Sequence, residues 1–444
     1  MSDVDNSQNL TTQGLAQDAV NQGNWGLAVQ YLQQWQQQPE LPMAAIWRSL
    51  ALRTLEMGDF QTRWDVAKLI SHCGPDLVQP KDVVALIGEA SEEDWSLLWF
   101  LVRILGEFHQ PESVSTLVDL LQRSPSEDVV AAITTALSQI GEPAIAPVSQ
   151  LLDSPQTRHA AVQILARIRH PDAAAAVACV VNDSDPAVRA LAITTLGDVA
   201  YPQAQPLLIA ALRDVAAEVR RAAVVGLGAR RDRLSSETIE QMGELLWDVS
   251  LSVRRAAISA LGRLNCKAAA DLLYDALQSS STPPILEPDL LQALASTETR
   301  AGLDHLAVYA EADSGKTDSG RRISAIAASL GRIKTSALVP KAVGLLMRLL
   351  TWTQSGDRAA RQAIATSLGQ LGQVDSTDTL IAMLSDADTG VRLHVTAALR
   401  KLAPTEAYRR LVAIAASPQT SPDLRQNASL ALQDWDQSAS PGLR

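Results

Sequence analysis

The stretch that decides the fold is Asp185-Pro186-Ala187-Val188-Arg189-Ala190-Leu191-Ala192-Ile193-Thr194-Thr195-Leu196-Gly197. Counted from Val188, residues that can be buried fall at positions 0, +3, +4, +7 and +8, which is one face of a helix. Pro186 stands where a helix can begin and Gly197 where a helix can end. The stretch therefore predicts one short amphipathic helix, and positions in its copies are counted from the residue equivalent to Val188.

Copies of this stretch recur along the chain at intervals of 28 to 38 residues. The copies begin at the following residues: Leu97, Val129, Thr157, Val188, Val219, Val253, Leu286, Arg322, Ala360, Val391 and Leu424. A second apolar segment, such as residues 204–212, lies between copies and also has the spacing of a helix. Each unit is therefore predicted to be two antiparallel helices, and stacking of units supplies the apolar cover that one pair lacks. Longer loops are expected at 279–284, 311–320 and 353–357.

The pattern from Asp183 to Gly197, D-x-D-P-x-V-R-x-x-A-x-x-x-L-G, resembles the short HEAT repeats named after the phycobilin lyases. The resemblance covers about residues 91–436. It implies an all-α chain in which about eleven HEAT-like helical pairs form a right-handed α-solenoid. Such a pattern specifies a fold much more strongly than it specifies a function.

Residues 9–90 precede the repeats and differ from them. Two turns, Gly23-Asn24-Trp25 and Gly58-Asp59-Phe60, lie 35 residues apart and resemble the hairpin turns of tetratricopeptide (TPR) repeats. Two hairpins are fewer than the three or so needed to stand alone, so we expect a TPR-like helical cap on the solenoid. Residues 1–8 and 437–444 are polar and are expected to be disordered tails.

Composition narrows the classes of protein. The net charge of −11 and the isoelectric point near 5.1 argue against nucleic-acid binding, which needs clustered Lys and Arg. Cys73, Cys179 and Cys266 are far apart, which argues against a disulfide framework or a zinc site. The start has no signal-peptide pattern, and no apolar run approaches the ~20 residues of a membrane span. We therefore expect a cytoplasmic protein without a transmembrane segment.

Tryptophan is concentrated in the first 100 residues, which hold six of the nine. Trp95 and Trp99 are four residues apart on one predicted helix face. Large aromatic side chains are usually buried, so a core role is favoured for the six. The alternative is an exposed partner surface formed by Trp25, Trp35, Trp95 and Trp99.

An arginine at position +1 is the most regular polar feature of the copies. The series is Arg158, Arg189, Arg220, Arg254, Arg361, Arg392 and Arg425. Acidic residues in the turns precede these arginines, as in the pairs Asp183/Asp185 and Asp386/Asp388. Because a guanidinium offers several donors in a fixed fork, we expect a structural ladder that bridges turn carboxylates and carbonyls of adjacent repeats.

Position +2 points away from the apolar stripe. It is occupied by His159, Arg221, Arg255, Gln362 and Gln426, and in HEAT-like arrays the second helix of each pair lines the concave wall. Arg230, Arg231 and Arg233 follow Arg221 in the next loop and extend a basic island in this acidic chain. The island is either a solvated surface or a site for a carboxylate-bearing ligand or an acidic partner.

No catalytic motif is recognisable in the sequence. It contains no P-loop, no G-x-S-x-G and no H-E-x-x-H. His72 and Cys73 are adjacent, but neighbours on a helix point about 100° apart, and free cysteines are usually inert. We therefore expect a non-catalytic scaffold or assembly factor that binds one or more proteins and needs no cofactor.

The family resemblance implies an alternative function. Phycobilin lyases of the E/F type attach or remove bilins on phycobiliprotein cysteines. If the chain acts in this way, Arg221 and Arg255 would bind the propionates of a bilin tetrapyrrole, and His159 and Trp247 would flank its rings. The partners would then be phycobiliproteins. No lyase-specific motif is recognisable, so the resemblance assigns no catalytic residue.

Overall fold

The computed structural model describes residues 2–36, 44–75, 77–91, 94–123, 126–230, 234–312 and 319–438, with side chains from residue 12 to residue 435 of these ranges. Regular secondary structure in this part of the chain is helical, without strands. The chain divides into two compact units, residues 1–207 (unit 1) and 208–444 (unit 2). Each unit is described by itself.

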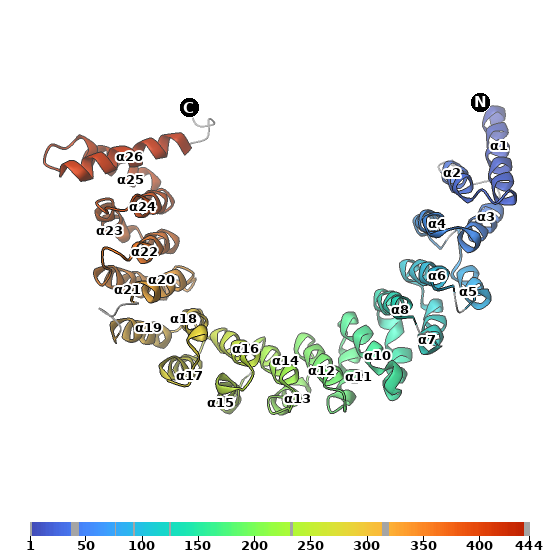
Figure 1. Ribbon diagram of the computed structural model, residues 1–444, viewed down its shortest axis with the longest axis horizontal. Helices are drawn as coiled ribbons and strands as arrows, with labels where there is room; N and C mark the ends of the chain where they lie inside the picture. Colours follow the sequence, from blue (N-terminus) through green and yellow to red (C-terminus); the bar gives the residue numbers. More distant parts are fainter. Residues whose placement is uncertain are drawn as a thin grey trace. The chain divides into compact units, whose positions relative to one another are not determined.

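Unit 1 is a series of helices joined by short turns (Figure 1). They are α1 (Ser2–Asn21), α2 (Trp25–Gln36), α3 (Ala44–Met57), α4 (Phe60–Cys73), α5 (Pro80–Glu89), α6 (Trp95–Phe108), α7 (Val114–Arg123), α8 (Glu127–Ile140), α9 (Ile145–Gln150), α10 (Pro155–Ile168), α11 (Pro171–Val177) and α12 (Pro186–Asp198). Helix α13 (Ala204–Ala211) falls at the division between the units.

Unit 2 continues the same alternation of helices. They are α14 (Ala217–Gly228), α15 (Ser236–Glu244), α16 (Leu251–Gly262), α17 (Lys267–Gln278), α18 (Glu287–Ser296), α19 (Arg300–Ala312), α20 (Ser319–Leu330), α21 (Val339–Thr351), α22 (Arg358–Leu371), α23 (Thr377–Met383), α24 (Thr389–Leu402), α25 (Pro404–Ala416) and α26 (Pro422–Ser438).

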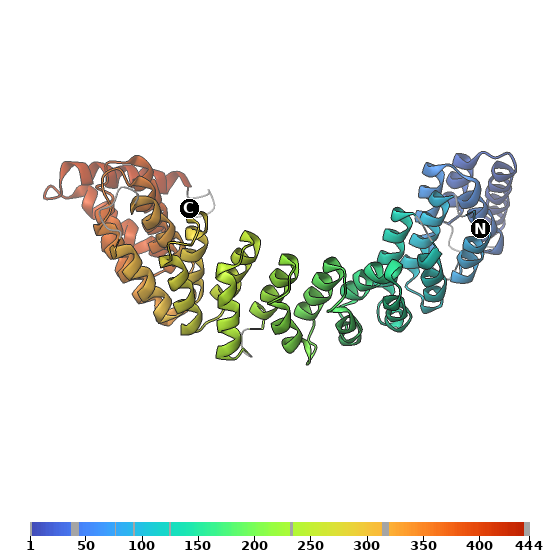
Figure 2. The ribbon, with the colours of Figure 1, turned by 60° about the horizontal axis from the view of Figure 1, so that its bottom comes forward.

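Within each unit, even-numbered helices pack on even-numbered helices and odd-numbered helices on odd-numbered ones. Even-numbered helices pack on one another in succession, from α4 to α12 in unit 1 and from α14 to α26 in unit 2. Odd-numbered helices do the same, for example α7 on α9 and α15 on α17. Figure 1 shows α15 and α17 on one side of unit 2 and α16 and α18 on the other, and Figure 2 shows the helices of each unit stacked in succession. The eleven predicted copies fall on, or directly before, the even-numbered helices α6 to α26, so the expected stack of helical pairs is confirmed.

The glycine of the repeated stretch lies at or near the end of its helix, as the sequence suggested: Gly228 and Gly262 are the last residues of α14 and α16. Gly106 and Gly369 are each followed by two more helical residues, and neither has a left-handed φ. A Cβ on Gly228 would lie 2.7 Å from Cβ of Ala260 and 2.9 Å from its Cα, and similar contacts join Gly106 to Ala136 and Gly369 to Ala398. The glycine therefore lets adjacent even-numbered helices approach closely.

We expect Gly228→Ala to lower the free energy of unfolding by about 1–3 kcal/mol, because the new methyl overpacks against the Ala260 backbone. Alanine is the better helix former by about 1 kcal/mol, so propensity alone predicts the opposite sign. Gly344→Ala is the matched control, since nothing lies within 4 Å of a Cβ at that helical site. Urea unfolding measures both changes. A stabilised Gly228→Ala variant would contradict the close-approach explanation.

The predicted arginine ladder is present. Arg220 donates from Nε and Nη2 to the Asp248 carboxylate of the next turn at 2.6 and 2.8 Å, and from Nη1 to the Asp214 and Val215 carbonyls. Arg361 binds Asp386 in the same way, and Arg158 reaches Asp183 at 2.6 Å. The last member, Arg425, departs from the pattern: its Nε is buried without a hydrogen-bond partner among the described residues.

Arg63 in α4 is a ladder member that the sequence analysis missed. Its Nη1 and Nη2 each donate to the Asp94 carboxylate at 2.8 Å, while Nε and Nη2 donate to the Leu55 and Glu56 carbonyls. Asp94 also caps α6 by accepting from Leu97 N–H. Helix α4, expected in the cap, is therefore tied to α6 by the bond type that joins the repeats.

Several boundaries of the predicted organisation shift. Residues 2–8, expected to be a disordered tail, form the beginning of α1. Helix α5 pairs with α6, so the stack of repeats includes a helix that the prediction had placed in the cap at 9–90. Helix α26 extends to Ser438, and the rest of the predicted C-terminal tail lies outside the described residues. The TPR-like nature of the two N-terminal hairpins stays a prediction.

Candidate functional site

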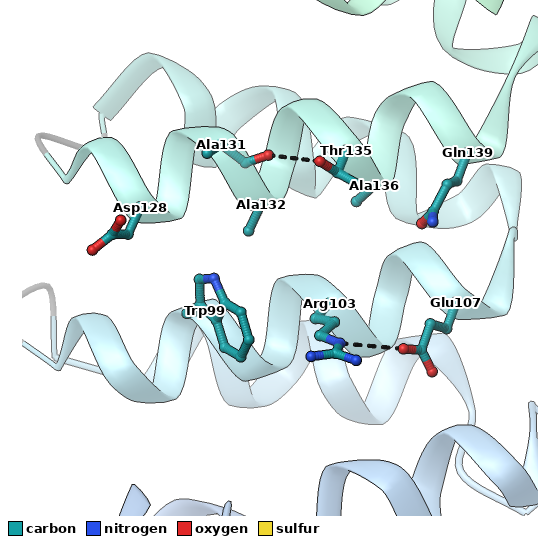
Figure 3. Close-up of a pocket in the computed structure, with 9 residues that line it drawn as sticks. All are labelled: Trp99, Arg103, Glu107, Asp128, Ala131, Ala132, Thr135, Ala136 and Gln139. Atoms are coloured by element: carbon teal, nitrogen blue, oxygen red, sulfur yellow. Dashed lines mark hydrogen bonds and ion pairs between the residues drawn. The ribbon is translucent and has the colours of Figure 1, made fainter. Parts of the chain in front are cut away.

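Positions +2, +6 and +10 of the second helices form one exposed stripe, because these positions lie nearly in line along a helix and opposite the buried face. On α6 the stripe is Trp99, Arg103 and Glu107. On α8 it is Ala131, Thr135 and Gln139. These six residues, with Asp128, Ala132 and Ala136, line a pocket of about 420 Å³ in unit 1, which we call the Trp–Arg pocket (Figure 3).

Trp99, which lines the Trp–Arg pocket, belongs to a cluster of aromatic rings whose other members lie behind the pocket wall. The rings of Trp64 on α4 and Trp99 on α6 stack with centroids 6.2 Å apart and an interplanar angle of 12°. The fully buried Phe100 meets both rings edge-on and so supports them from below. Phe60 extends the cluster, and 62% of its surface is exposed. Both tryptophans are half-buried and present part of their ring surface to solvent.

Arg103 lies against this cluster. Its guanidinium is 4.8 Å from the Trp64 ring centroid and 5.5 Å from that of Trp99, which is the geometry of a cation–π contact. Nε donates to Glu107 at 3.3 Å, whereas Nη1 and Nη2 make no hydrogen bond to a described residue. Lys68 lies over Trp64 at 5.2 Å and adds a second positive charge.

Small residues form the opposite side of the pocket. Ala131, Ala132 and Ala136 on α8 leave the space in front of Trp99 open, and Figure 3 shows them facing Trp99 and Arg103 across the gap between the two helices. Asp128 and Gln139 stand at the two ends of the α8 side. The pocket thus combines an aromatic wall, a cation with unused donors and a small-residue wall.

Unit 2 has a pocket built at the same register but with different chemistry. Gln362, Thr366 and Gln370 on α22 line a cavity of about 300 Å³ together with Arg332 and His394. Its walls are polar amides and hydroxyls and hold no aromatic ring other than the imidazole of His394. The shared register confirms that position +2 faces outward, as the sequence analysis expected.

Comparisons with known proteins agree with this architecture. The sequence model of HEAT repeats matches residues 83–156, 145–228, 206–295 and 346–433, which together cover more than half of the chain. The chain belongs to the HEAT-repeat family. No curated protein sequence matches it.

Solved structures similar to this HEAT-repeat protein share its fold. The karyopherin Kap121p bound to Nup53p is 14% identical at a TM-score of 0.50, over 96% of this chain and 57% of that chain. Kap121p bound to the extreme C-terminus of the protein phosphatase Cdc14p gives the same identity and TM-score, over 92% and 56%. The CpcE and CpcF complex of phycocyanin lyase from Nostoc sp. PCC7120 is 19% identical at a TM-score of 0.30, over 56% and 93%. This HEAT-repeat protein spans little more than half the length of Kap121p.

The basic and aromatic residues proposed for a bilin fall in both units. His159 is exposed on α10 of unit 1, whereas Arg221, Arg255 and Trp247 belong to unit 2. Arg221 is exposed, and Arg255 pairs with Asp289 at 3.2 Å. Trp247 is 40% exposed. Of the other arginines of the basic island, Arg230 is half-buried, and Arg231 and Arg233 lie outside the described residues.

The four tryptophans of the alternative partner surface differ in exposure, and its partner-binding role stays a prediction. Trp35 is completely buried, because α2 packs against both α3 and α4. Trp25 and Trp95 are half-buried and do not line the Trp–Arg pocket. Trp99 does line it. Trp64 and Arg103 were missed, although Trp64 is at +2 from Thr62 and Arg103 at +6 from Leu97, so extending the register would have found both.

Burial shifts the pKa values of some side chains, and Cys73 and Asp248 show two different outcomes. Burial raises the pKa of the Cys73 thiol to about 11, which keeps it protonated at neutral pH. Burial also acts to raise the pKa of Asp248, but hydrogen bonds from Arg220 and Ser250 N–H outweigh it and lower the pKa below its usual range.

No group of three or more His, Cys, Asp or Glu side chains that could hold a metal occurs among the described residues. Within the same ranges, no helix is both long and apolar enough to cross a membrane.

Proposed function

We propose that this HEAT-repeat protein is a non-catalytic scaffold or assembly factor that holds a segment of a partner protein in the Trp–Arg pocket. The observation that supports the proposal is the pair of stacked, half-exposed tryptophans with Arg103 lying over both rings. Tryptophan and arginine dominate the binding energy of protein interfaces, and they do so in pockets that exclude water. Stacked helical pairs offer extended surfaces of this kind.

The fold is consistent with a protein partner. Kap121p, which shares the fold, is bound to Nup53p in one solved structure and to a terminal segment of Cdc14p in another. The Trp–Arg pocket is open along the line between α6 and α8, so it has room for side chains of an extended segment. An extended segment also suits a surface formed by the second helices of successive repeats, because each repeat adds one row of contacts.

Site-specific photo-crosslinking tests this proposal. A benzophenone amino acid replaces Gln139 at the rim of the pocket, or Ser115 on the exposed side of α7 as the control, in the full chain. We expect a discrete protein to be cross-linked from position 139 in an extract of the source cells, and not from position 115. Adding Ala132→Arg, which fills the pocket, should abolish the product. Equal labelling at both positions, or a product that survives Ala132→Arg, would show that the pocket is not the binding site.

A bilin-binding function, with a phycobiliprotein as partner, is the second candidate. It is favoured by one observation: Arg221 and Arg255 occupy equivalent exposed positions on α14 and α16, which pack against each other. Packed helices lie about 8–10 Å apart, so the two guanidinium groups offer a pair of anion contacts across adjacent repeats.

Mixing the protein with a bilin and recording absorption and fluorescence tests this candidate. A red shift with raised fluorescence is expected, and it should be lost when Arg221→Ala and Arg255→Ala are combined. Arg103→Gln is the control and should leave the spectrum unchanged. A spectrum identical to that of the free bilin would reject the candidate.

A further inference from the structure

We infer that the segment bound in the Trp–Arg pocket carries an Asp or Glu side chain that binds Arg103, next to an apolar or aromatic side chain that packs between Trp99 and α8. This inference rests on the proposed protein-binding function and adds the chemistry of the partner. It follows from the unused donors of Arg103, from the order of charges along the pocket and from the size of the wall residues.

Comparison with the structural ladder shows what is unusual about Arg103. Arg220 and Arg361 each use all three guanidinium nitrogens on turn carboxylates and carbonyls. Arg103 uses Nε alone, for Glu107, and leaves Nη1 and Nη2 without a partner among the described residues. A carboxylate matches these two donors, as Asp94 does for Nη1 and Nη2 of Arg63.

Arg103 is also held in place before any ligand binds. The guanidinium contacts the rings of Trp64 and Trp99, and its Nε donates to Glu107, so several contacts favour the observed position. A side chain that is already ordered loses less entropy on binding, so its contacts contribute more to affinity. The Arg103–Glu107 pair does not compete strongly, because both side chains are more than a third exposed, and exposed pairs contribute at most about 1 kcal/mol.

The charges along the pocket set the direction of the segment. Arg103 and Glu107 line the α6 side, and Lys68 lies beside Arg103 over the Trp64 ring, outside the residues that line the pocket. On the α8 side, Arg167 donates to Thr135 at 3.3 Å. Asp128 stands on the α8 side, near Trp99. A carboxylate is therefore favoured beside Arg103 and Lys68 and disfavoured beside Asp128. The segment should be acidic at one end and neutral or basic at the other.

The space in front of Trp99 suits a flat apolar side chain. One face of the site is the Trp99 ring, and the other is formed by the methyl groups of Ala131, Ala132 and Ala136. An aromatic or branched aliphatic side chain placed there would stack on the indole and exclude water from the bond between Arg103 and the carboxylate.

Selection from a random peptide library displayed on phage, against the immobilised full chain, tests the inference. The enriched peptides should place Asp or Glu beside Phe, Tyr, Trp or Leu. Their affinity should fall about 10- to 100-fold with Arg103→Gln, the range expected when charged hydrogen bonds worth 1.5–3 kcal/mol are lost. Arg221→Gln removes an exposed arginine at position +2 of unit 2 and should have no effect.

A double-mutant cycle identifies the bond itself. Changing the acidic residue of a selected peptide to its amide should weaken binding to the wild-type chain but not further weaken binding to Arg103→Gln. Circular dichroism of each variant checks that the helices are intact. Some selected peptides could be basic or neutral and yet lose binding to the Ala132→Arg variant, which would show that they need an open pocket. Such peptides would overturn the inference and leave the scaffold proposal standing. Affinity unchanged by Arg103→Gln would overturn it as well, whereas the crosslinking experiment decides the scaffold proposal separately.

Discussion

Replacing Arg220 by alanine should lower the stability of the α14–α16 region by about 3 kcal/mol. The Asp248 side chain is only 5% exposed, and Arg220 supplies two of its hydrogen bonds as well as its nearest positive charge. Removing one partner of a buried ion pair typically costs 3–5 kcal/mol, because the other charge stays buried without compensation. The Asp214 and Val215 carbonyls lose their donor at the same time.

Arg221→Ala is the matched control for this prediction, since it removes the same side chain one residue later. Arg221 is exposed, and exposed substitutions usually change stability by less than about 0.5 kcal/mol. Because stacked repeats do not always unfold in one step, amide hydrogen exchange of α14 and α16 is the measurement, with urea unfolding of the whole chain beside it. Equal protection in the two variants would show that the ladder does not hold the repeats together. Arg220→Lys should fall between them, because it keeps the charge and loses the fork.

Trp35→Ala should destabilise the α1–α4 region by about 3–5 kcal/mol, the range found when a buried tryptophan is truncated to alanine. Trp35 is completely buried, and its Nε1 has no hydrogen-bond partner among the described residues, so the loss comes from packing. Burial agrees with the core role that the sequence analysis favoured for Trp35, and it excludes a direct contact between Trp35 and a partner.

Trp25→Ala is the control for Trp35→Ala. Trp25 is half-buried at the beginning of α2, so its truncation removes fewer contacts and should cost about half as much or less. Hydrogen exchange in α2 and α3 separates the two outcomes. A Trp35→Ala variant with native protection would mean that the α2 helix does not pack as the structure shows. Crosslinking from position 139 should be unaffected by either change.

The Trp–Arg pocket shows how far the sequence analysis reached. The sequence analysis favoured a core role for Trp99 and gave an exposed partner surface as the alternative, although the count from Val188 puts Trp99 at position +2. The structure places Trp99, half-buried, in the pocket. The same count would have placed Trp64 and Arg103 on the stripe, had it been extended to position +6 and upstream of Leu97. What the count could not give is that the Trp64 and Trp99 rings stack and that Arg103 also lies over Trp64, because those contacts join α4 to α6.

The sequence by itself determined the helices, their pairing and the arginine ladder, because all three repeat with the same period and depend on side chains close together in one or two neighbouring units. Tertiary structure decided the role of the repeated glycine, the burial of Trp35 and the contents of the pocket. These depend on how closely the second helix of one repeat approaches the second helix of the next. That distance is set by residues more than 25 positions apart in the sequence, such as Gly106 and Ala136. Periodicity reports which face of a helix is covered, whereas only packing shows what covers it.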